Sequence, residues 1–439
     1  MKEVNSEKIV NRIDQTNTRF SSGILTELRK QEYVFPDFDK EFSSINQSSF
    51  VSQGKTGYCW LLSALQCIEC FVHNKYNRTD IHFSKEYLIF WDKIEKANWF
   101  LEQLFERLPW NPEDRTIRYL LSRAMSDRGQ WNMARNLVEK YGLVPIDADE
   151  KIKNTGELNA CLSMLLRSAA VTLHQAFCNG KNRKVLSQIK DELLTDVVTV
   201  LCDRYGVPIK QVSLNSVTFF GIEKAVDPKE FYDRAIAFPF DEYISIFNDG
   251  SLSDGYIMDS VFLDTNMVGG ISPSFLHVTE EVFFECVLDQ VSVGEPCWFS
   301  CDAGKFNFRN IGIFDDTIFD FERISPLLEQ NLTKSFVNRY GIAGMTHAMV
   351  MQQTRCIGNN RWWQAYDSAE FRSNTNHISY LSDNWFKKYV FQAVVHKSFL
   401  NTDLFQISEY REVNPWDIFS IGIISVSYTH LRAHETLSD

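Results

Sequence analysis

Residues 53–65 carry the sequence Gln53-Gly54-Lys55-Thr56-Gly57-Tyr58-Cys59-Trp60-Leu61-Leu62-Ser63-Ala64-Leu65, a polar turn that runs directly into an apolar segment. This change of pattern predicts a loop followed by the N-terminus of a buried helix. A helix N-terminus carries partial positive charge and free N–H groups, which favour a thiolate over a thiol. Cys59 is therefore a candidate nucleophile. The alternative is an ordinary buried thiol that opens a core helix.

The loop itself offers a second candidate group. Gln53 lies six residues before Cys59, where its side-chain amide and the Cys59 backbone N–H can together bind an oxyanion. Gly54-Lys55-Thr56 also resembles the end of a phosphate-binding loop. That motif requires a glycine at position 49, which is Ser49 here, so the pattern for a nucleotide site is incomplete.

A nucleophilic thiol needs a base, and His347 is the best-placed histidine. It opens the apolar stretch 347–351, which predicts a buried strand. Asp367 follows the next predicted strand twenty residues later. If the two strands pair antiparallel, the Asp367 carboxylate reaches the imidazole and can hold it in one tautomer. The alternative for His347 is a structural histidine with satisfied hydrogen bonds.

Composition limits the possible function. The chain has 439 residues and a net charge of −12, which argues against an electrostatic grip on nucleic acid. No apolar run reaches the ~18 residues of a membrane span, and the N-terminus has no apolar core of a secretory signal. The ten cysteines show no framework spacing, which indicates free thiols in a reducing cytosol. Cys67-Ile68-Glu69-Cys70 is a lone CxxC with no second pair nearby, so no metal or other cofactor is expected.

The order of predicted elements indicates the fold class. Residues 84–108, 114–142 and 155–206 have helical periodicity, with Ser84 as an N-cap and Gly142 as a helix end. From about residue 215, short β-branched and aromatic runs predict strands of a mostly antiparallel sheet, namely Val217–Phe220, Cys297–Cys301, Ala348–Met351, Trp362–Tyr366 and Tyr389–Val395. Helices first and strands later predict an α+β fold.

The motifs extend beyond single residues and are similar to those of the bleomycin hydrolase/aminopeptidase C family, a papain-like group. The resemblance covers roughly residues 5–420, in order. The blocks that carry it are Gln53…Gly57-Tyr58-Cys59-Trp60, residues 83–98, Gly129-Gln130-Trp131-Asn132-Met133, residues 137–142, residues 294–306, Met345-Thr346-His347-Ala348-Met349-Val350, residues 381–386 and Asn414-Pro415-Trp416-Asp417.

The resemblance implies a papain-like cysteine peptidase fold with helical insertions and a cytosolic thiol aminopeptidase activity on peptides. It gives Cys59 the role of nucleophile, His347 that of acid and base, and Gln53 a place at the oxyanion. It also implies a homohexameric ring, built by a helical arm around 155–206, in which a C-terminal arm lies in the cleft. The substrate-binding residues are expected to be Trp60, Arg128 and Gly129.

Several positions depart from the family pattern. Asp367 replaces an Asn, Ala369 replaces a Trp and Arg128 replaces a Gly of the cleft. Loss of the Trp predicts a more hydrated His347–Asp367 pair. An Arg at position 128 either obstructs the cleft or favours acidic peptides. A catalytically weakened, ring-forming scaffold or peptide binder is therefore the alternative function.

The end of the chain also departs from the family, which stops soon after the Pro-Trp-Asp motif. We expect residues 1–421 to form one peptidase unit. Residues 422–439 are expected to be a non-native tail, which removes His430 and His434 from the list of candidate bases.

Overall fold

A computed structural model describes residues 28–30, 33–43, 52–146, 152, 154–308, 311–321, 332–369, 377–400 and 407–416 of the chain. Its helices are α3 (Phe38–Glu41), α4 (Cys59–Tyr76), α5 (Lys85–Glu106), α6 (Arg115–Ser122), α7 (Trp131–Tyr141), α8 (Gly156–Cys178), α9 (Arg183–Tyr205), α10 (Leu214–Val217), α11 (Pro228–Phe231), α12 (Glu280–Ser292), α13 (Lys334–Arg339) and α14 (Asp383–Tyr389). The expected tail at 422–439 lies outside the described residues.

The strands are β1 (Tyr243–Phe247), β2 (Ile257–Val261), β3 (Ser274–His277), β4 (Cys297–Cys301), β5 (Asn307–Phe308), β6 (Ile313–Phe314), β7 (His347–Ile357), β8 (Asn360–Tyr366), β9 (Ile378–Ser382), β10 (Val390–His396) and β11 (Glu409–Val413). They form one sheet in the order β11-β2-β3-β1-β10-β4-β7-β8-β9-β6-β5. Only three of its pairings, β1–β3, β2–β11 and β6–β9, are parallel. The predicted α+β class with a mostly antiparallel sheet is confirmed.

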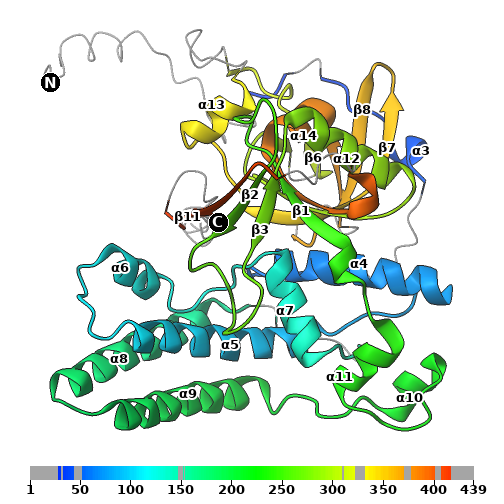
Figure 1. The fold of residues 1–439 in the computed structure, drawn as a ribbon. Coiled ribbons are helices and arrows are strands. Elements are labelled where there is room, and N and C mark those ends of the chain that lie inside the picture. Colours follow the sequence, from blue (N-terminus) through cyan, green and yellow to red (C-terminus); the bar gives the residue numbers. More distant parts are fainter. Residues whose placement is uncertain are drawn as a thin grey trace, which may run out of the picture.

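The helical half agrees with the helices predicted from the sequence at two places and differs from them at one. Helix α5 begins after Ser84, whose side chain accepts a hydrogen bond from the Tyr87 N–H, as the N-cap pattern predicts. The stretch 155–206 is a hairpin of α8 and α9 that packs on α5 (Figure 1). The stretch 114–142, predicted as one helix, is interrupted between α6 and α7. The interruption is residues 123–130, which lie against the loop before α4.

One predicted strand is wrong. Val217–Phe220 forms the end of α10 and a short 3-10 turn rather than a strand. Ser213 caps α10 by accepting from the Ser216 N–H, and Gly221 ends the turn at φ 74°. These local capping signals outweigh the β-propensity of a short Val-Thr-Phe-Phe run.

Helix α4 lies between the helical half and the sheet (Figure 1). Its side chains Trp60, Leu61 and Ala64 share one core cluster with Trp298 of β4 and Val350 of β7. The Trp298 indole N–H donates to the Trp60 carbonyl across this contact, at 3.1 Å. The helix that begins at Cys59 is therefore fixed against the strands that carry His347.

No helix among the described residues combines the length and apolar character that crossing a bilayer requires.

Candidate active site

Cys59 is the first residue of α4, as the sequence pattern predicts. The first turn of α4 contains no acidic side chain of its own, so the positive end of the helix dipole faces the sulfur. The backbone N–H of Ala348 points at the Cys59 sulfur, with a nitrogen-to-sulfur distance of 3.4 Å. Both features stabilise negative charge on the sulfur. The Ala348 contact has no sequence signal, because it depends on how β7 meets α4.

His347 opens β7 and stands between Cys59 and Asp367. Its Nε2 lies 2.7 Å from Asp367 Oδ1, which leaves Nδ1 for the hydrogen bond with the Cys59 thiol. Strands β7 and β8 pair antiparallel with Val350 opposite Tyr366. Because Asp367 directly follows Tyr366, this register brings the carboxylate to the imidazole. The structure thus brings together the three residues that the sequence pointed to.

Burial and charge act in opposite directions on the imidazole. Burial disfavours the imidazolium, but the negative charges of Asp367 and Cys59 outweigh it and raise the pKa of His347 well above 6.5. The protonated form of the His347 ring is therefore favoured. A protonated imidazole beside a thiolate is the resting state of a thiol nucleophile that carries its own acid.

The Asp367 carboxylate is held from several sides. Its Oδ1 accepts the backbone N–H of Ala369 at 2.9 Å, and its Oδ2 accepts the Ser379 hydroxyl of β9 at 3.4 Å. The expectation of a hydrated pair is wrong, since the side chains of His347 and Asp367 are only 9% and 1% exposed. Ser379 has no signal in the sequence, because it reaches Asp367 only through the pairing of β9 with β8.

Gln53 is positioned by the residue next to Asp367. The Gln53 N–H donates to the Ser368 carbonyl at 2.8 Å, and the Gln53 side-chain oxygen accepts the Ser368 hydroxyl at 3.3 Å. Because the side-chain oxygen of Gln53 accepts from Ser368, the NH₂ group of the same amide is left to act as a donor. An oxyanion needs such a donor. The Thr56 hydroxyl closes the same loop onto the Gln53 carbonyl at 2.7 Å. The segment that resembled a phosphate-binding loop therefore forms an internal turn.

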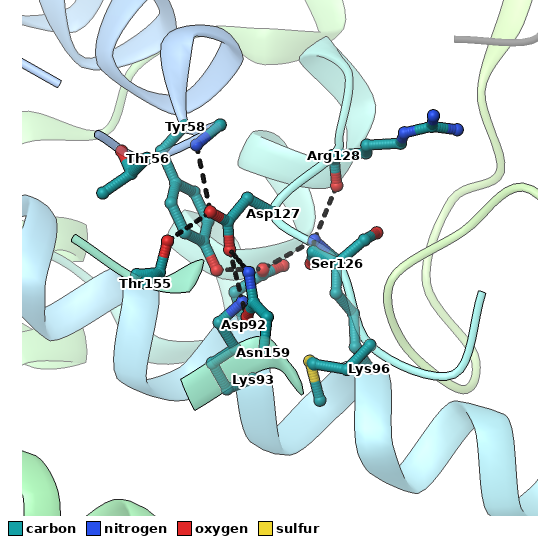
Figure 2. Close-up of polar contacts among 12 residues, drawn as sticks. Thr56, Tyr58, Asp92, Lys93, Lys96, Ser126, Asp127, Arg128, Thr155 and Asn159 are labelled. Carbon is teal, nitrogen blue, oxygen red and sulfur yellow. Dashed lines mark hydrogen bonds and ion pairs between the residues drawn. The ribbon is translucent and has the colours of Figure 1, made fainter. Parts of the chain in front are cut away.

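Three residues were expected to bind substrate, and the structure places them differently. Trp60 is 1% exposed and packs in the core cluster between the helical half and the sheet, so it offers little surface to a substrate. Gly129 lies against it, and a Cβ there would be 2.3 Å from the indole. The half-buried Arg128 side chain points away from the buried polar groups beneath the loop (Figure 2). Burial and the neighbouring Arg123 lower the pKa of Arg128 to about 10.

The CxxC cysteines lie on α4, where Cys67 is buried in the core, and all ten cysteines of the chain are free thiols. Among the residues that the structure describes, no group of His, Cys, Asp and Glu has an arrangement suited to a metal ion. The groups that the structure brings together at the site are the Cys59 thiol, the His347 imidazole and the Asp367 carboxylate.

A thiol at the start of a helix that faces an imidazole and a carboxylate on an antiparallel sheet defines the class of papain-like cysteine peptidases. The chain belongs to the Peptidase C1-like family, whose sequence model matches residues 2–420. It is 30% identical to aminopeptidase C of Listeria monocytogenes over 397 residues, which cover 88% of both chains.

Two further comparisons agree with this. The chain is 27% identical to bleomycin hydrolase of Gallus gallus over 83% of its own length and 84% of the relative. The crystal structure of pepw from Lactobacillus rhamnosis superposes with a TM-score of 0.83, at 24% identity, over 95% of this chain and 98% of that one. The resemblance inferred from the motifs is confirmed, as is the papain-like fold.

Proposed function

We propose that the chain is a cysteine-type aminopeptidase that removes N-terminal residues from peptides, with Cys59, His347 and Asp367 as its reacting group. The observation that carries the proposal is the alignment of thiol, imidazole and carboxylate. His347 Nε2 lies 2.7 Å from Asp367, and the Cys59 side chain forms a hydrogen bond with the same imidazole on its other side. The relatives named aminopeptidase C support the aminopeptidase activity.

The reaction follows from these groups. The Cys59 thiolate attacks the carbonyl carbon of the first peptide bond, and the oxyanion that forms is stabilised by the Cys59 backbone N–H and the Gln53 amide. His347 then gives its proton to the leaving amine, the C–N bond breaks and a thioester remains. Water, deprotonated by His347, attacks the thioester and releases the N-terminal residue as a carboxylic acid. The thiolate and imidazolium are thereby restored.

The end of the described chain lies near the proposed active site. Strand β11 pairs with β2, and Trp416 packs edge-on against Tyr119 of α6 with the ring centroids 5.5 Å apart. Tyr119 in turn interacts electrostatically with Arg128, which directly precedes Gly129 beside the Cys59 loop. The last described residue, Trp416, therefore lies close to the segment that contacts the Cys59 loop.

A pair of matched peptides tests the activity. We expect hydrolysis of a peptide with a free N-terminus and at least about a hundredfold lower kcat/KM for the same peptide acetylated at its N-terminus. Separation of the products by chromatography shows which bond is cut. Release of internal fragments from the acetylated peptide at the same rate would show an endopeptidase instead.

We also propose that the α8–α9 hairpin is an assembly surface in a homohexamer and that the protein works in the cytoplasm. Met164 and Val171, seven residues apart on one face of α8, are 67% and 53% exposed. Such exposed apolar side chains support burial against another subunit. The exposed thiols Cys161, Cys178 and Cys356 support a reducing compartment.

A further inference from the structure

We propose that Asp127 is a positioning residue that fixes the backbone around Cys59, and that a buried charge network based on α5 holds Asp127 in place. The inference rests on the proposed function, but it concerns a residue outside the reacting group. Asp127 belongs to the interruption between α6 and α7, and it stands 68 positions after Cys59 in the sequence.

Asp127 contacts the chain on both sides of Cys59, in the loop before α4 and in the first turn of α4. Its Oδ2 accepts the backbone N–H of Gly57 at 3.0 Å, and its own carbonyl accepts the Trp60 indole N–H at 2.6 Å. The approach is close, since a Cβ at Gly57 would lie 2.9 Å from the Asp127 Cβ. One residue therefore restrains the chain two positions before the thiol and one position after it.

Four groups contact the Asp127 carboxylate: the Gly57 N–H, Lys93, Thr155 and Asn159 (Figure 2). Lys93 Nζ of α5 lies 2.5 Å from Oδ1, and the Asn159 amide donates to the same oxygen at 2.7 Å. The Thr155 hydroxyl donates to Oδ2, the oxygen that holds Gly57. Because Lys93 is fully buried, this ion pair is shielded from solvent.

A second lysine of α5 fixes the backbone on both sides of Asp127. Lys96 Nζ donates to the carbonyls of Ser126 at 3.2 Å and Arg128 at 2.6 Å. The same ammonium pairs with Asp92 at 2.7 Å. The segment 126–128 thus has fixed carbonyls and a fixed carboxylate, and it cannot relax independently of α5.

The network also reaches the residue directly before the thiol. The Tyr58 hydroxyl donates to Asp92 at 2.9 Å, and Lys93 Nζ lies 5.2 Å from the centre of the Tyr58 ring. Tyr58 is fully buried. The Tyr58 side chain is therefore bonded to Asp92 of α5, and the Gly57 amide to Asp127, which Lys93 of α5 holds.

The groups around Asp127 favour the ionised form of its carboxyl. Burial alone would raise the pKa of its carboxyl, but the charge of Lys93 and the hydrogen bonds from Lys93, Thr155 and Gly57 hold the pKa far below its usual range. Thr155 directly precedes α8, and Asn159 lies in the first turn of that helix. The start of the α8–α9 hairpin is thereby connected to the nucleophile loop through one carboxylate.

Two double variants of the full chain test the role of Asp127. Lys93→Met with Asp127→Leu leaves no charge unpaired but removes the acceptor for the Gly57 N–H. Lys93→Met with Asp127→Asn keeps an acceptor oxygen there. We expect the leucine double variant to lose at least about thirtyfold in kcat with KM within about threefold, because a displaced nucleophile costs rate more than binding. The asparagine double variant should stay within about fivefold of the wild type.

Alkylation of Cys59 by iodoacetamide across pH 5–9 is the second measurement, and it does not depend on peptide turnover. The leucine double variant should react more slowly than the wild type at neutral pH, because its thiol is displaced from His347, whereas the asparagine double variant should follow the wild type. Equal behaviour of the two double variants in both assays would overturn the proposal. If the wild type alkylates as expected but hydrolyses no peptide, the proposed function would be contradicted, while the proposed role of Asp127 would stand.

Asp249→Asn serves as the matched control, because Asp249 is also a buried aspartate paired with a cationic group, His277, and lies outside the reacting group. It should lower the unfolding midpoint and leave the alkylation profile unchanged.

If the leucine double variant does not fold, Thr155→Val decides the question. It removes the hydroxyl from Oδ2 and should lower kcat by about two- to fivefold, since one hydrogen bond of several is lost. A Thr155→Val enzyme with unchanged kcat and alkylation profile would overturn the proposal.

Discussion

At the residue scale, the charge of Asp367 distinguishes this site from one built with a neutral amide. The carboxylate contacts His347 Nε2 at 2.7 Å and also accepts from Ala369 and Ser379. An Asn side chain would keep these contacts, since its oxygen can accept from His347 and Ala369 while its NH₂ donates to the Ser379 hydroxyl. The Asp therefore adds charge without changing the geometry.

The variant Asp367→Asn isolates that charge. The negative charge raises the pKa of His347, so its removal should lower that pKa and shift the alkaline limb of the kcat/KM profile to lower pH. We expect the alkaline limb to move to lower pH, with kcat/KM at the optimum within about tenfold of the wild type. The measurement is kcat/KM from pH 4 to 10. An alkaline limb at the wild-type pH would show that Asp367 does not set the protonation of His347.

The sequence identified Cys59, His347 and Asp367 because each has a local signal: a helix start, an apolar strand and a strand end. Asp127 had no such signal. It lies in a stretch with helical periodicity, and its role depends on Lys93, Asn159 and Gly57, which three separate segments supply. Groups that act through tertiary contacts are invisible to spacing and periodicity.

At the element scale, prediction worked where one pattern dominates a segment. Strand β4 has the predicted bounds, and α5 starts at the predicted cap. The single helix predicted for 114–142 was wrong because residues 123–130 have favourable helix propensity but turn away to contact the Cys59 loop. Tertiary contacts outweigh propensity there.

Strand β11 is anchored by a second buried charge cluster at the other end of the sheet. Arg411 pairs with Asp259 through two contacts of 2.7 and 2.8 Å, and His277 lies 3.6 Å from Asp259 and 3.1 Å from Asp249. The cluster joins β2, β3 and β11, so it holds the edge strand β11 to the sheet.

The acid stability of the fold should depend on Asp249. Burial opposes ionisation of its carboxyl, but hydrogen bonds from His277 and Ser251 outweigh this and lower its pKa from 3.8 to about 2. A lowered pKa adds stability above pH 4 that is lost as the pH falls toward 2. Asp249→Asn should cost about 2 kcal/mol at pH 6 and flatten the loss of stability between pH 4 and 2. Urea unfolding at several pH values measures both, and an unchanged pH dependence would contradict this account.

At the scale of the whole molecule, α4 joins a helical half to the sheet and places the thiol at the border between them (Figure 1). The helical half carries the α8–α9 hairpin and the network around Asp127, while the sheet carries His347 and Asp367. Catalysis therefore requires the two halves to be docked, with Trp298 and Trp60 in the contact.

The proposed assembly gives a prediction at the same scale. Met164→Asp combined with Val171→Asp places charge on the exposed face of α8 without touching the core, so the fold should be kept and association lost. Light scattering after size exclusion should give a particle much smaller than that of the wild type. A wild type that is already monomeric at 51.0 kDa, or a double variant of unchanged mass, would contradict the assembly role of this face.

The most direct test of the whole account is peptide hydrolysis by Cys59→Ala beside Cys70→Ala, a matched change on the same helix. We predict that Cys59→Ala lowers kcat by at least about a thousandfold, because no other group at the site can form the thioester. Cys70→Ala should hydrolyse the free-amine peptide at the wild-type rate. Hydrolysis by Cys59→Ala at a rate close to that of the wild type would contradict the central claim that the Cys59 thiolate is the nucleophile.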